Sequence, residues 1–219
     1  MEGRYCPFGK KRNEKIHRRE RTMKRLITPM IVWLVLFIPA FTYAATWQMD
    51  PAHSSFQFKI RHLTVSNVKG EFSKFRGVVT MDDQNMTDLK VEVIIDGASV
   101  NTGHAQRDEH LKGPDFFDVI QYPTITFVSK KVTKADTNRL KVVGDLTLHG
   151  VTREITLDVE GPTPEVKDPW GSFRRGATAI TKINRRDFGL TWNKVLDNGG
   201  LVVGDEVNIY AEVELVRKQ

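Results

Sequence analysis

The chain has 219 residues and a formal net charge of +6 at pH 7, but the charge is unevenly distributed. Residues 1–44 hold ten of the 33 Lys and Arg and three of the 27 Asp and Glu, which leaves 23 basic and 24 acidic side chains in residues 45–219. This balance gives the main part of the chain no global charge that would favour nucleic acid. The single cysteine, Cys6, also lies in residues 1–44. Residues 45–219 therefore have no disulfide, thiolate metal site or cysteine nucleophile.

The N-terminal segment has the three parts of a secretory signal peptide. Residues 1–25 are polar and basic, Leu26–Phe41 is mostly apolar, and small residues follow at Ala44 and Ala45. We therefore predict cleavage after about Ala44 and a periplasmic or secreted location. No other stretch approaches the length of a membrane span, so any membrane contact of the mature protein is expected to be transient at most.

The start of this signal peptide is placed at Met23, which two basic residues follow directly. The predicted organisation is therefore an N-terminal extension over residues 1–22 from a mis-assigned start, a signal peptide over residues 23–44, and a mature domain. An uncleaved membrane anchor is the alternative. The apolar run is short for a span and contains Pro39 near its end, and both features favour cleavage.

Residues 45–219 are patterned mainly as β-strands, because apolar and polar residues alternate between turn-forming segments. Eight strands are predicted, over Phe56–Arg61, Asn67–Asp82, Leu89–Ile95, Thr124–Val132, Leu140–Leu148, Ile155–Val159, Ser172–Ile183 and Asp205–Val216. Their short connections make most neighbours antiparallel, which predicts an all-β barrel or sandwich. In the second strand the apolar phase slips near Lys74 and Gly77 interrupts the pattern, as a bulge or a sharp barrel bend would require.

The longest break in this pattern is Asn101–Phe127. It contains the best helix candidate of the domain, Ala105–Leu111, and Pro114 follows soon after. Charged residues lie beside aromatic ones throughout the segment. A loop that is both apolar and charged suits the mouth of a container, so we place the mouth of the predicted barrel here.

A series of short motifs, each weak alone, occurs in order along residues 46–216. They are Asp50-Pro51-Ala52-His53-Ser54-Ser55-Phe56, Arg61-His62-Leu63, Gly70-Glu71-Phe72, Ala98-Ser99-Val100-Asn101-Thr102, Arg107-Asp108-Glu109-His110-Leu111, Asp115-Phe116-Phe117-Asp118, Tyr122-Pro123-Thr124-Ile125-Thr126-Phe127, Gly144-Asp145-Leu146-Thr147-Leu148-His149-Gly150-Val151-Thr152, Ile183-Asn184-Arg185-Arg186-Asp187-Phe188-Gly189-Leu190 and Gly204-Asp205-Glu206-Val207. As an ordered set, they resemble the YceI-like family of bacterial polyisoprenoid-binding proteins.

The resemblance implies a lipocalin-like barrel of eight antiparallel strands, with a short helix in the Asn101–Pro123 loop and an elongated apolar cavity. It also implies a periplasmic or secreted protein that binds a long isoprenoid, such as a polyprenyl phosphate or a quinone tail, for transport or storage. Members of the family are understood to be non-enzymatic. The oligomeric state stays open between monomer and homodimer.

Apolar residues on the predicted inward rows are the candidates for the cavity wall. They are Phe56, Phe58, Ile60, Phe72, Phe75, Val91, Val93, Phe116, Phe117 and Phe127. Each could equally belong to an ordinary packed core, since periodicity does not separate a filled barrel from a hollow one.

Polar residues near the predicted mouth are the candidates for the ligand head group: Arg61, Arg107, Asp108, His110 and Arg186. An arginine matches a phosphate bidentately. The alternative for Arg107 and Asp108 is an ion pair that pins the helix, and for Arg186 a tie between the seventh strand and its loop. Arg61 and its neighbour His62 have the same ambiguity.

A secreted lipid hydrolase that uses Asp108 and His110 as acid and base is the second class of function. No histidine pair in the sequence has HxH or HExxH spacing, and there is no Gly-x-Ser-x-Gly motif. We therefore predict a binding protein with neither metal nor cofactor. A module that hands a quinone to a redox partner fits the fold class, but no residue supports it directly.

Overall fold

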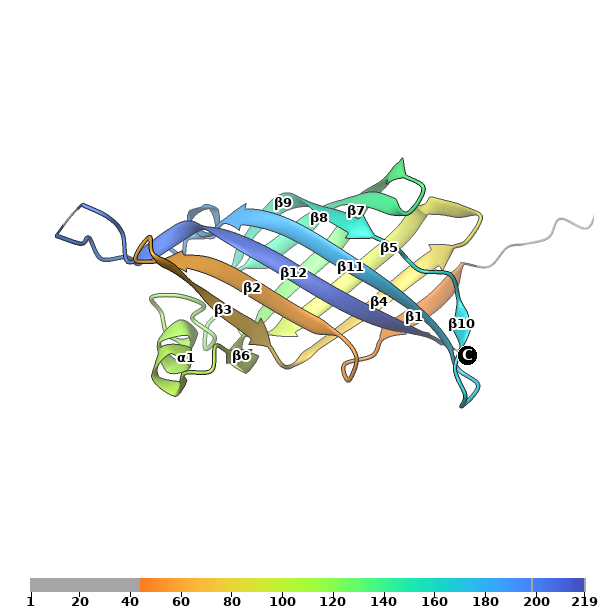
Figure 1. Cartoon of the computed structure of the whole chain (residues 1–219), viewed down its shortest axis with the longest axis horizontal. Helices are drawn as coiled ribbons and strands as arrows, with labels where there is room; N and C mark the ends of the chain where they lie inside the picture. Colours follow the sequence, from red (N-terminus) through yellow and green to blue (C-terminus); the bar gives the residue numbers. More distant parts are fainter. Residues whose placement is uncertain (1–43, 198, 219) are drawn as a thin grey trace, which may run out of the picture. The chain divides into compact units, whose positions relative to one another are not determined.

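The computed structural model describes residues 44–197 and 199–218 (Figure 1). The predicted N-terminal extension (residues 1–22) and the signal peptide up to residue 43 lie outside the described residues. Within the described ranges, the protein has no helix that combines the length and apolar character required to cross a bilayer.

The described chain is built almost entirely from strands. Their bounds are β1 Ala45–Met49, β2 Ser55–His62, β3 Ser66–Phe72, β4 Phe75–Asp82, β5 Asn85–Asp96, β6 Val100–Asn101, β7 Thr124–Asp136, β8 Arg139–Leu148, β9 Val151–Glu160, β10 Val166–Lys167, β11 Phe173–Asn184 and β12 Val203–Arg217. One α-helix, α1 (Ala105–Lys112), and two 3-10 turns, η1 (Gly97–Ser99) and η2 (Arg185–Phe188), complete the described elements.

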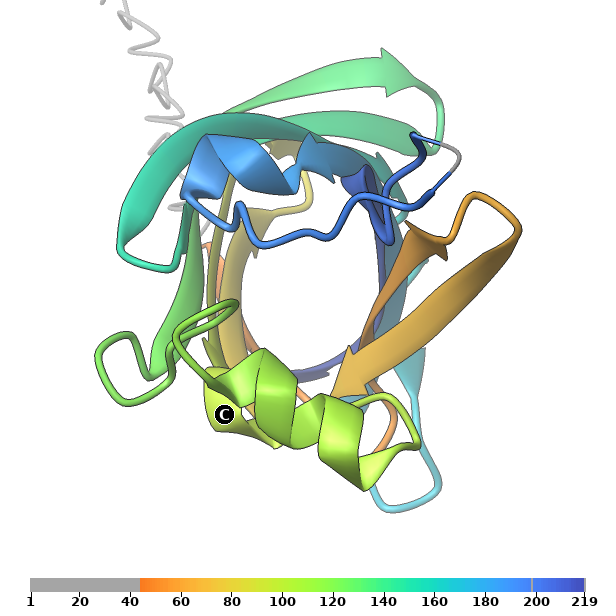
Figure 2. The same cartoon turned by 90° about the vertical axis from the view of Figure 1, so that its left-hand side faces the viewer.

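Eight of these strands form a closed antiparallel barrel, in the order β11-β9-β8-β7-β5-β4-β1-β12, and pairing between β11 and β12 closes the ring. The remaining wall strands lengthen the barrel at one end, because β2 follows β1 along the same edge of β12 and β3 follows β4. The barrel is seen from that end in Figure 2, with α1 beside it. The predicted fold, an eight-stranded antiparallel barrel with a short helix in the Asn101–Pro123 segment, is confirmed.

The second predicted strand is in fact two strands, β3 and β4, divided at Ser73 and Lys74. The chain bends there and exchanges its pairing with β2 for pairing with β1, which explains the phase slip near Lys74. Gly77 lies in β4, where an added Cβ would come within 2.3 Å of Sδ of Met49. The prediction missed β1, since five residues next to the expected cleavage site are too few for a clear alternation.

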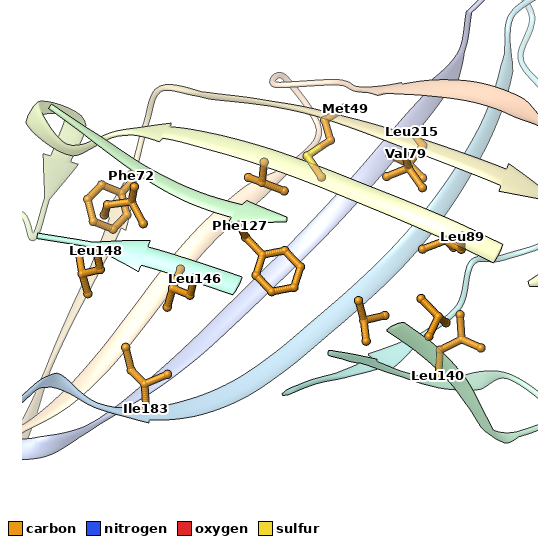
Figure 3. Packing of buried hydrophobic residues seen from close by; sticks show 14 of the residues in the cluster. Met49, Phe72, Val79, Leu89, Phe127, Leu140, Leu146, Leu148, Ile183 and Leu215 are labelled. Atoms are coloured by element: carbon orange, nitrogen blue, oxygen red, sulfur yellow. The ribbon is translucent and has the colours of Figure 1, made fainter. Parts of the chain in front are cut away.

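The barrel interior is made by the inward rows that the alternation predicts. On β8, Leu140, Val142, Leu146 and Leu148 are all buried. Leu146 is the cross-strand partner of Phe127 on β7, and both side chains point into the interior (Figure 3). Gly144 belongs to the same row. A Cβ there would lie 2.5 Å from Cζ of Phe127, so this glycine makes room for the aromatic ring.

The end of the barrel away from α1 is closed by Trp47, which is only 1% exposed. The guanidinium of Arg175 lies over the indole at 5.2 Å from the ring centroid and is itself held by Asp83, with 2.7 Å between Nη2 and Oδ2. Trp47 and Arg175 therefore form a floor, and the opposite end is the one that α1 and the neighbouring loops surround.

Candidate ligand-binding cavity

The barrel encloses a cavity of about 420 Å³. Its wall is formed by inward side chains of successive strands, such as Ala179 and Ile183 of β11 and Ile209 and Val213 of β12. The volume lies within the range of roughly 300–1,000 Å³ that is typical of small-molecule sites. The interior is therefore hollow, which periodicity alone left open.

Nine of the ten predicted wall residues border this cavity: Phe56, Phe58, Ile60, Phe72, Val91, Val93, Phe116, Phe117 and Phe127. Phe75 does not. It comes directly after the bend at Ser73 and Lys74, and its ring packs edge-on against Phe56 with 4.7 Å between centroids. The prediction placed Phe75 on the wall because it could not include this bend.

The ionisable residues of the wall belong to the end of β2, to α1 and to η2, at the end of the barrel where α1 is found (Figure 1). They are Arg61, His62, Arg107, His110 and Arg185. Over residues 44–197 and 199–218, no Asp or Glu borders the cavity. Arg61 and His110 are exposed, while Val79, Met81 and Leu215, which lie on the strands beside β1 near the floor, are buried. The cavity therefore reaches the surface at the end of Arg61 and His110, which we call the mouth.

Helix α1 holds Arg107 at the mouth through Thr102. Arg107 donates from Nε to Oγ1 of Thr102 at 2.7 Å and from Nη2 to its carbonyl at 2.9 Å. Asp108 accepts from the backbone amide of Thr102 at 2.9 Å and from its hydroxyl, and it does not border the cavity. Asp108 is thus an anchor of the helix rather than a neighbour of the ligand space.

His110 connects the helix to the loops that surround the mouth. Its Nε2 lies 2.9 Å from Oδ2 of Asp115, and its ring meets those of Phe116 and Trp192 edge-on, each at 5.0 Å. Trp192 borders the cavity too and was not predicted, because it lies in a loop without strand periodicity. Asp108 and His110 have separate partners, so the structure does not bring them together as an acid and a base.

The cavity-facing arginine of the Asn184–Leu190 turn is Arg185, where the prediction named Arg186. Arg185 is buried and donates to the carbonyls of Gly204, at 2.9 Å, and Leu190, and to Asp205 at 3.2 Å. Burial lowers the pKa of its guanidinium. Arg186 bonds Asp205 at 2.8 Å and does not border the cavity. The inward row Ala179, Thr181, Ile183 extends by period two to position 185, a signal that the sequence contained.

Replacing Arg185 by leucine should lower the free energy of unfolding by about 3 kcal/mol, because it leaves buried carbonyl acceptors without a donor. Arg186→Leu is the matched control and should cost less than about 1 kcal/mol, since it removes an exposed ion pair. Urea unfolding of both variants measures the difference. Equal losses would contradict the assignment of Arg185 as the structural arginine of the mouth.

Arg61 is fixed by a turn that it stabilises. Its Nε and Nη2 donate to the carbonyl of Thr64 at 3.0 and 2.6 Å. Arg61, Arg107 and Arg185 therefore all reach the mouth with part of their donor set already used on backbone carbonyls. Such arginines are pre-positioned, which lowers the ordering cost of holding an anion with their remaining donors.

A second polar cluster lies near the floor and is a salt-bridge network. Oδ2 of Asp50 is 2.8 Å from Nδ1 of His53 and 2.9 Å from Nη1 of Arg174, which also contacts Glu214. Asp50, His53 and Glu214 come close enough together to present three metal-ligand atoms. Arg174 pairs with Asp50, with Glu214 and also with Asp168, so the carboxylates of the cluster already share a cationic partner.

This network should make the stability of the barrel sensitive to acid. Hydrogen bonds from His53 and from Arg174 lower the pKa of Asp50 from 3.8 to about 2. A carboxyl group whose pKa is lower in the folded state stabilises the fold above its unfolded pKa and loses this contribution as the pH falls towards its folded pKa. Between about pH 4 and pH 2, wild-type stability should therefore fall more steeply than that of Asp50→Asn. Urea unfolding of both proteins across this pH interval measures the difference. Stability curves that run parallel against pH would contradict the role of Asp50.

A closed antiparallel barrel with an apolar interior and a polar mouth defines a class of small binding barrels. Residues 47–215 match the family model described as YceI-like domain, and the chain belongs to this family. The resemblance found in the sequence motifs is thereby confirmed.

Among curated proteins, a UPF0312 protein of Vibrio parahaemolyticus is 38% identical over 168 residues, which cover 76% of this chain and 88% of that protein. Among solved structures, the Campylobacter jejuni YceI protein is 36% identical with a TM-score of 0.62, covering 74% of this chain and 91% of that one. A polyisoprenoid binding domain from Saccharophagus degradans shares the fold with a TM-score of 0.58 at 18% identity, covering 80% and 99%.

Proposed function

We propose that this protein binds a long-chain isoprenoid lipid in its barrel cavity and transports or stores it in the periplasm. The observation that carries the proposal is the distribution of side chains around the cavity. Aliphatic and aromatic residues line its length, and the ionisable wall residues gather at the mouth. Such a cavity matches a long apolar chain with one polar end.

Burial alone supplies useful affinity for such a chain. Removing one CH₂ group from water is worth about 0.8 kcal/mol, so a five-carbon isoprene unit contributes roughly 4 kcal/mol before ordering costs. A few buried units therefore need no polar contact to bind. The Saccharophagus degradans domain described as polyisoprenoid-binding has the same fold. Because the two sequences are only 18% identical, this similarity establishes a shared fold and no more. The proposal therefore rests on the cavity of this chain.

The head group fits the positive end of the cavity. Arg61, Arg107 and Arg185 border the mouth and no carboxylate among the described residues does so. Arginine binds phosphate oxygens through charge-assisted hydrogen bonds, whereas a neutral quinone offers only carbonyl acceptors. The mouth therefore favours a polyprenyl phosphate over a quinone tail.

Titration with a polyprenyl phosphate and with the corresponding neutral polyprenol tests this proposal. Trp192 borders the cavity and Trp47 does not, so ligand entry should change indole fluorescence in wild type and much less in Trp192→Phe. Both lipids should bind, and the phosphate more tightly. Absence of binding by either lipid would contradict the proposed function, and equal affinities would contradict only the head-group choice.

The hydrolase alternative has less support from the geometry. Asp108 contacts Thr102 and His110 contacts Asp115, and only the histidine borders the cavity. Asp108→Ala and His110→Ala separate the two classes of function: under the binding proposal neither variant has a lipid turnover to lose. Hydrolysis of a bound lipid by wild type, abolished in both variants, would establish the enzyme instead.

A further inference from the structure

Three segments surround the mouth, and each presents an exposed aliphatic side chain. They are the turn between β2 and β3, with Val65 74% exposed, the segment between α1 and β7, with Ile120 96% exposed, and the loop between η2 and β12, with Val195 75% exposed. We call them the three rim segments. Figure 2 looks onto the end of the barrel where they lie.

The rim segments belong to one end of the barrel by their contacts. Leu63 donates its amide to the carbonyl of Val202 at 2.8 Å, which joins the β2–β3 turn to the loop before β12. The segment between α1 and β7 starts at the helix that contributes Arg107 to the mouth. It rejoins the barrel wall at Thr124, which pairs with Asp96 of β5.

In two of the rim segments, local backbone geometry holds the apolar side chain outward. Leu63 and Thr64 before Val65, and Asp118 before Ile120, are non-glycine residues with left-handed φ angles of 51°, 62° and 44°. Backbone strain of this kind persists only where the surrounding structure enforces it. Val65 donates to the carbonyl of His62 at 3.1 Å, and Arg61 holds Thr64 as described above.

The rim segments carry few charged side chains: Asp115, Asp118 and Asp197, together with Lys194. On the neighbouring elements, Lys112 pairs with Glu109 at 2.8 Å and Arg186 with Asp205 at 2.8 Å. The rim segments therefore present no excess of positive charge that would select an anionic surface. Three separate aliphatic tips around an opening also differ from the contiguous apolar patch that is typical of a protein interface.

From these observations we propose that the rim segments dock on a lipid bilayer, with Val65, Ile120 and Val195 inserted among the acyl chains and the mouth facing the membrane. This inference rests on the proposed function and adds where the ligand enters and leaves. An isoprenoid in this orientation passes between bilayer and barrel without crossing water. Docking through aliphatic tips predicts binding to neutral as well as anionic bilayers.

Vesicle flotation of residues 45–219, which contain every strand of the closed barrel, tests the proposal without the apolar N-terminal segment. The protein should float with phosphatidylcholine vesicles and with phosphatidylethanolamine–phosphatidylglycerol vesicles. The triple variant Val65→Asp, Ile120→Asp, Val195→Asp should lower the partition constant by about a hundredfold or more, and each single variant by about tenfold. Single variants keep the test decisive where the triple variant does not fold.

Trp170→Asp is the matched control, since Trp170 is 85% exposed near the other end of the barrel, in the turn that leads into β11. It should float like wild type. The proposal would be overturned if wild type did not float, or if flotation required phosphatidylglycerol. It would also be overturned if Trp170→Asp lost flotation while the rim variants kept it. Isoprenoid titration in solution separates the two claims. A protein that binds isoprenoid but does not float contradicts only the docking proposal. A protein that floats but does not bind isoprenoid contradicts only the proposed function.

Discussion

Replacing Ala179 by phenylalanine should weaken isoprenoid binding by about a hundredfold or more while the barrel stays folded. Ala179 borders the cavity and is the cross-strand partner of Ala211 on β12 and of Val159 on β9. Two small residues opposite each other leave the space that a phenylalanine ring would occupy. Displacing even one isoprene unit forfeits roughly 4 kcal/mol of burial, and 1.4 kcal/mol corresponds to tenfold in affinity.

The next residue along the strand supplies the control for this experiment. Ile180 points out of the barrel and is exposed, so Ile180→Phe adds the same ring to the outer face. It should bind isoprenoid like wild type. Titration of both variants with the same polyprenyl phosphate, alongside circular dichroism, distinguishes a filled cavity from general damage. An Ala179→Phe variant that is folded and binds normally would show that the ligand does not occupy the barrel.

Trp47→Ala should lower the free energy of unfolding by about 3–5 kcal/mol, the range for deleting a fully buried aromatic side chain. The loss removes the floor of the barrel and the surface on which the Arg175 guanidinium rests. Arg175 is itself buried, so truncating the indole also opens a cavity beside a charged group.

Trp170→Ala removes the same kind of side chain from an exposed position and should change stability by less than about 0.5 kcal/mol. Urea unfolding of the two tryptophan variants gives both values under identical conditions. Similar losses in the two would mean that Trp47 is not the floor of the barrel.

Most strands could be predicted because one signal, alternation with period two, repeats along the wall, whereas the choice of a barrel over a sandwich came from the resemblance to the YceI-like family. Inward residues such as Val142 on β8 and Ile209 on β12 are fixed by this alternation and by pairing with strands of the same pattern. The structural consequences of breaks in the alternation were harder to predict. The bend at Lys74 left a phase slip in the sequence, but its consequence for Phe75 depends on where β1 and β2 lie, which no local pattern contains.

The sequence placed the mouth at the Asn101–Phe127 segment, which contains α1, but identified only some of the residues that border the cavity there. Alternation continued past the end of β11 would have selected Arg185 over Arg186. Trp192 and the rim residues Val65 and Val195 lie in turns and loops, where exposure is decided by contacts between distant segments such as that between Leu63 and Val202. Those contacts have no counterpart in the spacing of residues along the chain.

The central claim, that the barrel holds an isoprenoid lipid, is tested most directly by native mass spectrometry of the protein exported to the periplasm of a bacterial host, followed by solvent extraction of what it carries. We expect a discrete added mass that extracts as a polyprenyl phosphate and is absent from Ala179→Phe. Wild-type protein that arrives empty, and stays empty after incubation with isoprenoids, would contradict the claim and leave the family fold without this function.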